Sequence, residues 1–311
     1  MSAERALAMR LDHLLLAVRD LDAAARDFRE RLGMNAQLGG AHPGVGTHNA
    51  LVHFGTAYLE LIAVDDPTTE RARVFTRFLE GGDAPYTFAL AVTDLEAASA
   101  GLRERGLNVD PPRAGSRRTP GGVLLRWRAA DLRPGGAGPG PDAPPLPFLI
   151  QWEADQAGRG WFDDRVSLAQ HEVPWGAAHA LIIATEDPEA LAAEYGRLFG
   201  WERIGTGRHP TLRMPDGDGV NPRLGPAPYV VLVGPTPNDA SELDRLVGDA
   251  ARARIDRHGA GVLGLAVQVS VVDEAVAALA RRGVRAHAHP EGRWAVVAPE
   301  DAHGLLLELV Q

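Results

Sequence analysis

Two apolar runs, LDHLLLAV at residues 11–18 and HNALVHFGTAYLELIAV at residues 48–64, indicate how this chain folds. Apolar runs this short predict buried β-strands. The first run carries one imidazole, His13, and the second carries one carboxylate, Glu60. Burying a polar side chain costs free energy unless the side chain finds a partner. These two side chains are therefore the first candidates for a functional site.

Net charge and residue types exclude several classes of function. The 311 residues carry a formal net charge of −9, whereas surfaces that bind nucleic acid or anionic lipid are basic. We therefore expect no nucleic acid and no membrane as a partner. The chain contains no cysteine, which excludes thiol nucleophiles, disulfides and iron–sulfur clusters. It also contains no lysine, which excludes Schiff-base chemistry and the lysine of nucleotide-binding loops.

The N-terminal segment predicts where the protein resides. Residues 1–10, MSAERALAMR, contain charged side chains and no long apolar segment, so we expect no secretion signal. No stretch of about 18 uninterrupted apolar residues occurs, so we expect no transmembrane helix. These features predict a cytoplasmic protein. The expected partner is a small molecule, and the sequence leaves a homodimer open.

The first 64 residues predict a β-α-β-β unit, with one further short strand. The first strand is followed by a helix that Asp20 or Asp22 can cap and that Gly33 ends. Two strands then follow, and the short break at residues 55–56 between them is typical of a hairpin turn. The expected strands are residues 13–18, 35–38, 50–54 and 58–64.

This unit recurs three times along the chain. New units begin at Tyr86, His179 and Leu263, each with an apolar strand followed by a helical pattern. The spacing from His13 to His179 equals the spacing from Arg31 to Arg197, so we align the first unit with the third. The second and fourth units share LRERGL at residues 102–107 and LARRGV at residues 279–284.

The paired units predict two domains. The first spans residues 1–160, with units at 11–64 and 84–153, and the second spans residues 175–311, with units at 177–233 and 263–310. Residues 133–145, RPGGAGPGPDAPP, predict a flexible loop, and residues 161–174 predict a connector. One unit has too little core alone. The predicted class is α+β, with four βαβββ modules pairing into two cupped, open mixed β-sheet barrels and the helices outside.

These segments resemble the vicinal oxygen chelate superfamily, which includes glyoxalases, extradiol dioxygenases and bleomycin-binding proteins. Within it, LDHLLLAVRDLDAA, GGAHPGVGTHNALVHFG and YLELIAV are similar to the opening segments of the glyoxalase-like domain family. PGGVLLRWR and LPFLIQWE are similar to that family's second module. The resemblance implies a small oxygen-rich substrate, a divalent metal ion such as Zn, Mn, Ni or Fe, and ligands on the first and last strands of paired modules.

The resemblance implies specific ligands. In the first cup they are His13 and Glu60, with Thr87 and Gln151 at about the corresponding positions of the second module. In the second cup they are His179 and Glu308, which form a weaker site. Neither cup has three or four strong ligands, so His13 and Glu60 could instead form a hydrogen-bonded pair or a metal-free acid–base pair.

Further site candidates come from the residues themselves. With a two-residue turn, His53 pairs with Tyr58 and faces the same side as Glu60, as a third ligand or proton shuttle; one more turn residue would direct it outwards. His42 and Asn49 lie in a glycine-rich segment that can approach a substrate closely. We also expect substrate contacts from Arg126, if it faces into the cup, and from Gln151.

Two functions follow from these expectations. The first is a metal-dependent lyase, isomerase or oxygenase that uses the first cup, with Glu60 and His53 in catalytic roles. The alternative is a metal-free protein that binds and sequesters a drug or metabolite. A cleft lined by aromatic side chains favours the second function.

Overall fold

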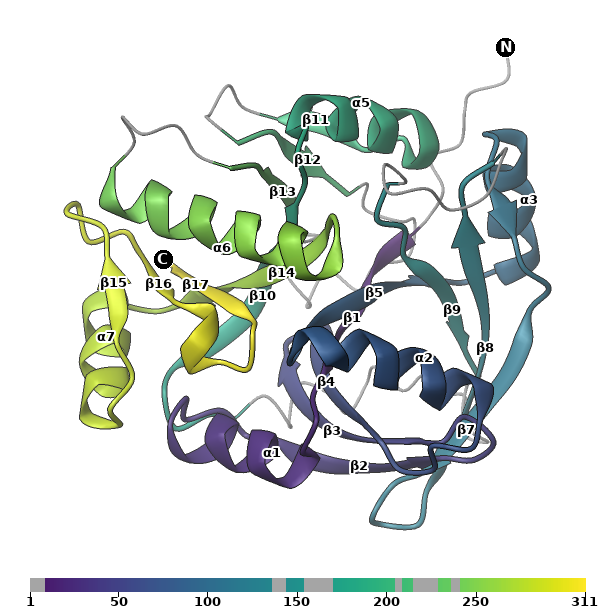
Figure 1. Ribbon diagram of the computed structural model, residues 1–311, viewed down its shortest axis with the longest axis horizontal. Helices are drawn as coiled ribbons and strands as arrows, with labels where there is room; N and C mark the ends of the chain where they lie inside the picture. The colour runs from purple at the N-terminus through teal and green to yellow at the C-terminus, as the bar shows by residue number, and fades with distance from the viewer. Residues whose placement is uncertain (1–8, 136–143, 154–169, 205–208, 215–228, 236–240) are drawn as a thin grey trace.

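The computed structural model describes residues 9–135, 144–153, 170–204, 209–214, 229–235 and 241–311 (Figure 1). Most of the predicted Pro/Gly loop at 133–145 and of the connector at 161–174 lies outside the described residues. The chain forms two mixed β-sheets with helices packed on them, side by side in Figure 1. Among the described residues, no helix is long and apolar enough to cross a membrane.

The first sheet has the strand order β2-β3-β4-β1-β5-β9-β8-β6, and β7 pairs with β8. Its strands are β1 (Met9–Ala17), β2 (Gln37–His42), β3 (Thr47–Phe54), β4 (Ala57–Val64), β5 (Ala84–Val92), β6 (Asn108–Val109), β7 (Arg113–Arg118), β8 (Leu124–Arg133) and β9 (Phe148–Trp152). Its helices are α1 (Leu21–Glu30), α2 (Glu70–Phe78), the short 3₁₀ helix η1 (Leu79–Gly81) and α3 (Leu95–Glu104).

The second sheet repeats the same order as β11-β12-β13-β10-β14-β17-β16-β15. Its strands are β10 (Trp175–Ala184), β11 (Glu202–Ile204), β12 (Thr211–Arg213), β13 (Tyr229–Val233), β14 (Gly261–Val269), β15 (Ala286–Ala288), β16 (Trp294–Val297) and β17 (Leu306–Val310). Its helices are α5 (Pro188–Phe199), α6 (Glu242–His258), α7 (Val272–Arg281) and the 3₁₀ helix η3 (Pro299–Asp301).

The predicted fold class is confirmed. In each sheet two βαβββ modules meet at a central antiparallel pair of strands, β1 with β5 and β10 with β14. Within a module the first strand runs parallel to the last, as β1 does with β4. Twisted sheets of this kind curl into cups that stay open at one side, and the outer face of each is covered by helices.

Local signals in the first module act as predicted. Asp20 caps α1 by accepting a hydrogen bond from the backbone N–H of Ala23, at 2.9 Å. Gly55 has a φ of +65°, which a two-residue hairpin turn requires and glycine adopts without strain. This turn sets the register of β3 against β4, in which His53 pairs with Tyr58.

Two helices, α2 and α6, were not predicted, and both follow the last strand of an odd-numbered module. Both sequences are rich in arginine, and both lie after the last strand of a module, where the predicted β-α-β-β unit contains no helix. The buried side chains of α2 are Ala72 and Phe75. In Figure 1, α2 lies across the face of the first sheet, and α6 lies over the second sheet. Both helices contribute to the pocket described below.

The two sheets share one apolar core. Leu14 and Leu16 of β1 belong to the same buried cluster as Leu181 and Ile183 of β10. The indole N–H of Trp175, at the start of β10, donates to the backbone carbonyl of Leu32 at 2.8 Å. Burying one such aliphatic side chain contributes about 1.5–3 kcal/mol, so the two halves stabilise each other.

His303 links the second half of the chain to the first. Its Nδ1 lies 2.9 Å from Oδ2 of Asp83, just before β5, and its Nε2 lies 3.1 Å from Oδ2 of Asp27 on α1. The hydrogen bond to Asp83, helped by Asp27 and opposed by burial, raises the pKa of His303 above its ordinary 6.5. One imidazole therefore joins two carboxylates across the interface.

Replacing His303 by glutamine should lower stability at pH 6 but leave it nearly unchanged at pH 8.5. A raised pKa in the folded chain means that the ion pairs stabilise fully below the unfolded pKa and are lost as pH rises through the folded pKa. We expect a loss of about 1 kcal/mol in the free energy of unfolding at pH 6, measured by urea denaturation. His287→Gln, on edge strand β15, is the control. Equal losses at both pH values would assign the effect to packing rather than charge.

Candidate functional site

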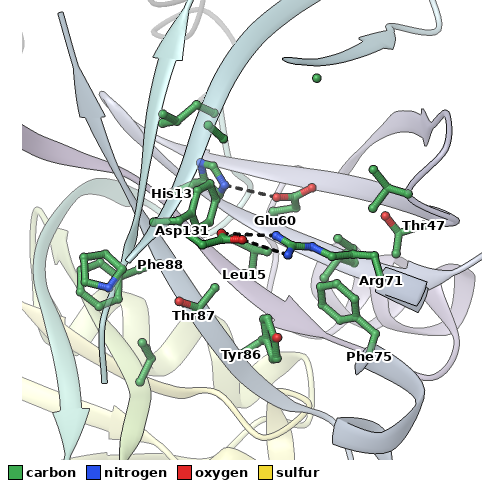
Figure 2. A pocket seen from close by; sticks show the side chains of 18 of the residues that line it. His13, Leu15, Thr47, Glu60, Arg71, Phe75, Tyr86, Thr87, Phe88 and Asp131 are labelled. Atoms are coloured by element: carbon green, nitrogen blue, oxygen red, sulfur yellow. Dashed lines mark hydrogen bonds and ion pairs between the residues drawn. The ribbon is translucent and has the colours of Figure 1, made fainter. Parts of the chain in front are cut away.

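The first cup contains a cavity of about 520 Å³, a size that suits a small organic molecule. The first sheet forms most of its lining, α2 contributes one wall, and the end of α6 with the start of β14 contributes another. Figure 2 shows His13 and Glu60 directed toward each other inside it, with Arg71 reaching to Asp131 nearby. The apolar and aromatic lining includes Leu15, Ile62, Phe75, Phe78, Tyr86, Trp127, Phe148 and Trp152.

His13 and Glu60 meet, as the two apolar runs suggested. β1 and β4 are parallel neighbours, and their register places Glu60 beside Leu15, two residues beyond His13. Nε2 of His13 lies 3.4 Å from Oε2 of Glu60, and both side chains are more than nine-tenths buried. The ring of His13 stacks on Tyr58, with 4.5 Å between the ring centroids, so the imidazole is fixed in orientation.

Asp12 completes this pair and was missed from the sequence. β1 contains an irregularity here: Leu11 pairs with Leu90 and His13 pairs with Ala89, which leaves Asp12 as an extra residue. Such a bulge allows two consecutive side chains to reach the same region, which a regular strand forbids. Oδ1 of Asp12, which is fully buried, lies 2.6 Å from Nδ1 of His13. The signal was the sequence Asp-His itself, but nothing local revealed the bulge.

Trp152 binds the other oxygen of the Asp12 carboxylate. Its indole N–H donates to Oδ2 of Asp12 at 3.0 Å, from strand β9, which is separated from β1 by β5. An ionised carboxylate that accepts hydrogen bonds on both oxygens is stabilised in a buried place. Asp12 is therefore positioned to hold the Nδ1–H of His13, which directs Nε2 toward Glu60.

Asn49 and His42 hold Glu60 from the other side. The side-chain N–H of Asn49 donates to Oε1 of Glu60 at 2.6 Å. Nδ2 of Asn49 also lies 3.2 Å from Nε2 of His42, whose Nδ1 lies 2.9 Å from Oγ1 of Thr47. Both N–H groups of the Asn49 amide are thereby used, one on the carboxylate and one on the imidazole. The predicted candidates His42 and Asn49 both line the cavity.

His42 is a neutral hydrogen-bonding group in this arrangement. Burial lowers its pKa below the ordinary 6.5, against a smaller opposing effect of the Glu60 charge. A neutral imidazole that accepts from Asn49 on Nε2 carries its proton on Nδ1 and donates it to Thr47. A continuous chain of contacts therefore runs from Thr47 through Glu60 and His13 to Trp152.

Two glycines in the segment GGAHPGVGTHN make this packing possible. A Cβ on Gly39 would lie 2.1 Å from Oδ1 of Asn49, so only glycine leaves room for the amide. Gly46 has a φ of +78°, and a Cβ there would lie 2.5 Å from Oγ1 of Thr69. The glycine-rich segment is thus a strand pair, β2 and β3, packed around Asn49 rather than a loose loop.

His53 lies near the site but does not line the cavity. The predicted pairing with Tyr58 is confirmed, and the imidazole is 1% exposed. Its ring packs on Tyr58 at 5.6 Å between centroids, while His13 stacks on the same tyrosine. Two-residue alternation placed His53 on the correct side of the sheet. The structure does not bring it to Glu60.

Arg126 and Gln151 lie outside the cavity, which corrects their prediction as substrate-binding residues. On β8, Trp127 lines the cavity, so alternation directs the exposed Arg126 to the opposite face. The amide of Gln151 donates to the carbonyl of Thr93 at 3.0 Å and accepts from the N–H of Leu95 at 3.1 Å. Gln151 therefore helps to order the start of α3.

The modules can be aligned through their helix caps. Asp20, Asp94 and Asp187 each cap the first helix of a module. Counting back from these caps, His13 corresponds to Thr87 in the second module. The residue that corresponds to Glu60 is Phe148, because Glu60 pairs with Leu15 and Phe148 pairs with Ala89 at equivalent places. The four positions in the first cup are thus His13, Glu60, Thr87 and Phe148, and Gln151 is not among them.

In the second cup the predicted pair of His179 and Glu308 is wrong as a counterpart of His13 and Glu60. Ala180 pairs with Ala266 as His13 pairs with Ala89, so Ala180 occupies the His13 position. His179 is the extra residue of β10, which is the place of Asp12. The deduced spacing of 166 residues was off by one, because the helix caps Asp20 and Asp187 are 167 residues apart.

The second cup has one ionisable side chain at the four equivalent positions. The residues at its four positions are Ala180, Val231, Gly264 and Glu308. Glu308 corresponds to Phe148, and its pairing partner on β14 is Ala266. Burial raises the pKa of the Glu308 carboxyl to about 7. The second cup therefore holds a single carboxyl group without an imidazole at these positions.

With paired βαβββ modules and an imidazole–carboxylate pair in one cup, the chain has the architecture of a glyoxalase-like protein. The sequence profile described as "Glyoxalase-like domain" matches residues 11–199, which is more than half of the chain. The chain belongs to this family. A second profile, "Glyoxalase/Bleomycin resistance protein/Dioxygenase superfamily", matches residues 179–296. A search of curated proteins found no match.

Solved structures with the same fold were found at low sequence identity. A hypothetical protein from Staphylococcus aureus has a TM-score of 0.64 at 14% identity, covering 97% of this chain and 98% of that one. A mutant of 4-hydroxymandelate synthase from Streptomyces coelicolor has a TM-score of 0.57 at 16% identity, covering 98% and 93%. A xylose isomerase-like TIM barrel/4-hydroxyphenylpyruvate dioxygenase fusion protein has a TM-score of 0.55 at 16% identity, with all of this chain covering 50% of that one. At these identities the likeness shows the fold alone.

The residues at the four positions do not fit the divalent metal that members of the superfamily usually bind. His13 and Glu60 carry atoms that can bind a metal, but Phe148 offers no donor atom, and the hydroxyl of Thr87 is 3.4 Å from the carbonyl of Leu146. Catalytic zinc sites use three protein ligands. In the described part of the chain, no three His, Asp or Glu side chains are grouped to hold a metal. Oε1 of Glu60, which lies 3.6 Å from Nε2 of His42, already accepts a hydrogen bond from the amide of Asn49.

Replacing Glu308 by glutamine should stabilise the protein at alkaline pH. Because the carboxyl pKa is raised to about 7 in the folded chain, the unfolded chain releases this proton first, and stability falls as pH rises from 4.5 through 7. We expect Glu308→Gln to raise the free energy of unfolding by about 2 kcal/mol at pH 8 and to change it little at pH 4.5. Glu300→Gln, on the exposed helix η3, is the control. A gain at neither pH would refute the raised pKa.

Proposed function

We propose that this protein is an enzyme that catalyses proton transfer on a small oxygen-rich molecule in the first cup, as an isomerase or lyase, with Glu60 as the base. One observation carries the proposal: Glu60, His13 and Asp12 form a buried carboxylate–imidazole–carboxylate series, of which Glu60 and His13 line a cavity of about 520 Å³. The predicted metal dependence is not part of the proposal, because the donor set does not fit.

Glu60 has the geometry of an oriented general base. Asn49 holds Oε1 at 2.6 Å, which leaves Oε2 facing His13 and the cavity. A carboxylate takes a proton from carbon when it is placed within hydrogen-bond reach and when water is largely excluded. A suitable substrate is a carbon acid whose C–H bond lies next to a carbonyl group. The proton then passes to Oε2, and the electron pair of the broken C–H bond moves to the carbonyl oxygen.

His13 supplies the complementary proton. Asp12 accepts from Nδ1 at 2.6 Å, which fixes the ring so that an N–H at Nε2 would face the cavity. That N–H can donate to the substrate oxygen as negative charge develops there. When Glu60 returns its proton to a different carbon or face, the product is an isomer and both groups are restored. In a lyase, the electron pair on the carbonyl oxygen instead moves back and expels a leaving group from the neighbouring carbon, and the leaving group takes the proton held by Glu60.

A second function, metal-free binding and sequestration of a small molecule, is favoured by the lining of the cavity. Phe75, Tyr86, Phe148 and Trp152 form extensive aromatic walls, which bind planar apolar surfaces well. In that case Glu60 would act as an acceptor for a ligand N–H or O–H. The two functions differ in turnover, not in the place where the molecule binds.

Proton exchange with solvent tests the proposed enzyme. We expect native protein to exchange the hydrogens next to the carbonyl in a compound from a panel of 2-oxo acids, 2-hydroxy ketones and 1,3-dicarbonyl esters, followed by ¹H NMR in D₂O. Glu60→Gln should lower the rate about 10²–10⁴-fold, because the amide cannot accept the proton as a base. His13→Gln should also lower it.

Glu308→Gln is the matched control, since it changes a buried carboxyl of the second cup and should leave the rate unchanged. An unaltered rate in Glu60→Gln, or no exchange of any compound by native protein, would contradict the enzyme proposal. Binding of a compound without exchange would favour sequestration. Metal content by elemental analysis accompanies the assay: a rate lost with chelator and restored by Zn²⁺, Mn²⁺, Ni²⁺ or Fe²⁺ would show that a metal is required after all.

A further inference from the structure

The cavity has the opposite charge from the protein as a whole. The chain carries a formal net charge of −9. Four arginines and two carboxylates line the cavity, so with neutral histidines its lining has a net charge of +2 (4 − 2). A low-dielectric pocket with one sign of charge concentrates ligands of the other sign. The lining residues with formal charge are Arg71, Arg113, Arg117, Arg254, Glu60 and Asp131.

Two of these arginines are already compensated. Arg71 and Arg113 both bind Asp131, with contacts of 3.1 and 2.8 Å to its Oδ2. Burial opposes ionisation of Asp131, but the hydrogen bonds from Arg113 and Arg71 outweigh it, so its pKa lies below the usual range. The charges of Arg71 and Arg113 are therefore partly neutralised by Asp131.

Arg254 is a buried cation with which no described carboxylate forms an ion pair. It lies on α6 and is 6% exposed, and it lines the cavity. Its Nε donates to the carbonyl of Val262 at 3.0 Å and its Nη1 donates to that of Gly259 at 2.8 Å. No Asp or Glu of the described residues forms an ion pair with it, and burial alone lowers its pKa, to about 10. The guanidinium is thus still charged at neutral pH, at a cost in free energy that a bound anion would offset.

The surroundings of Arg254 leave room for its charged end and add no negative charge. A Cβ on Gly261 would lie 2.2 Å from Nη2 of Arg254, so glycine makes the space. His258, which also lines the cavity, stacks on Phe78, and burial lowers its pKa to about 4, so this imidazole is neutral at pH 7. The guanidinium carbon lies 5.9 Å from the centre of the Phe78 ring.

Arg254 and Glu60 lie at separate places along the cavity. Nη2 of Arg254 is 3.5 Å from the carbonyl of Pro85 on β5, and Glu60 is two strands away on β4. Pro85 is two residues before Thr87, which lies opposite Leu15, the partner of Glu60. With strands about 4.8 Å apart and a rise of about 3.3 Å per residue, the backbones of Pro85 and Glu60 are about 12 Å apart.

We propose that the molecule bound in the first cup is an anion, a carboxylate or a phosphate ester, whose charged end binds Arg254 while its carbonyl end faces Glu60. The apolar side chains of Phe75 and Tyr86 line the cavity and suit an uncharged middle section. Planar guanidinium groups bind both kinds of anion through paired N–H donors. The inference rests on the proposed function for the carbonyl end, but anion binding by Arg254 is testable without turnover.

Calorimetric titration of the full chain tests the proposal. The probes are 3-benzoylpropionate, its neutral amide, and phenacyl phosphate, which separate a carboxylate ligand from a phosphate ligand. We expect at least one anion to bind, and the neutral amide to bind at least 10-fold more weakly. Arg254→Gln should lower the affinity for that anion at least 10-fold and leave the affinity for the amide unchanged.

Arg254 also binds carbonyls at the end of α6, so Arg254→Gln could fail to fold. Ala260, which is partly exposed and lines the cavity, provides a second variant that keeps the arginine. Ala260→Asp should lower anion affinity by placing a carboxylate beside the guanidinium, and the isosteric Ala260→Asn should not. Equal binding of anion and amide by native protein, no binding of either anion, or equal effects of Ala260→Asp and Ala260→Asn would overturn the proposal. Glu60→Gln should still bind the anion, so loss of turnover without loss of binding separates this inference from the proposed function.

Discussion

The site depends on one extra residue in the central strand of the first sheet. In a regular strand, Asp12 and His13 would face opposite sides, and the carboxylate could not hold the ring. The bulge brings both to one place, where Asp12 binds Nδ1 of His13 and leaves Nε2 facing Glu60. Because β1 also pairs with β4 and β5, the same strand fixes the partners on both sides. The second sheet has the same bulge, but His179 is its extra residue and Ala180 follows it. The position of His13 therefore carries no imidazole there.

The two halves of the chain contribute unequally to one cavity. The first sheet supplies the polar series from Thr47 to Asp12, while the second half supplies Arg254 and His258 from the end of α6. Buried polar groups of this kind are stable only when each finds a partner, and here strands β1, β2, β3, β4 and β9 provide the partners for one another. The second cup lacks that series, yet its helix closes the cavity of the first. A division of this kind explains why both halves share one core.

Much of this could be read from the sequence because strands, caps and turns are local. The alternation along β3 and β4 placed His53 opposite Tyr58, residue type narrowed the cap of α1 to Asp20 or Asp22, and Gly55 was assigned to the hairpin turn. Arg126 and Gln151 were misplaced because alternation says that residues share a face but not which face meets the cavity. The helices α2 and α6 were missed because the predicted repeat has its helix after the first strand of each unit, although they build two of the cavity walls.

By itself, the sequence determined the repeated βαβββ pattern and the α+β class and singled out His13 and Glu60 as candidates, because hydrophobic periodicity and turn residues act over short distances. Only the tertiary structure decided that Asp12 joins the site, that Phe148 rather than Gln151 stands at the fourth position, and that Arg254 reaches the first cup from the other half of the chain. Each of these depends on the register between strands or on contacts between segments far apart in sequence. A shift of one residue changes which side chain faces the cavity, and composition does not encode that shift.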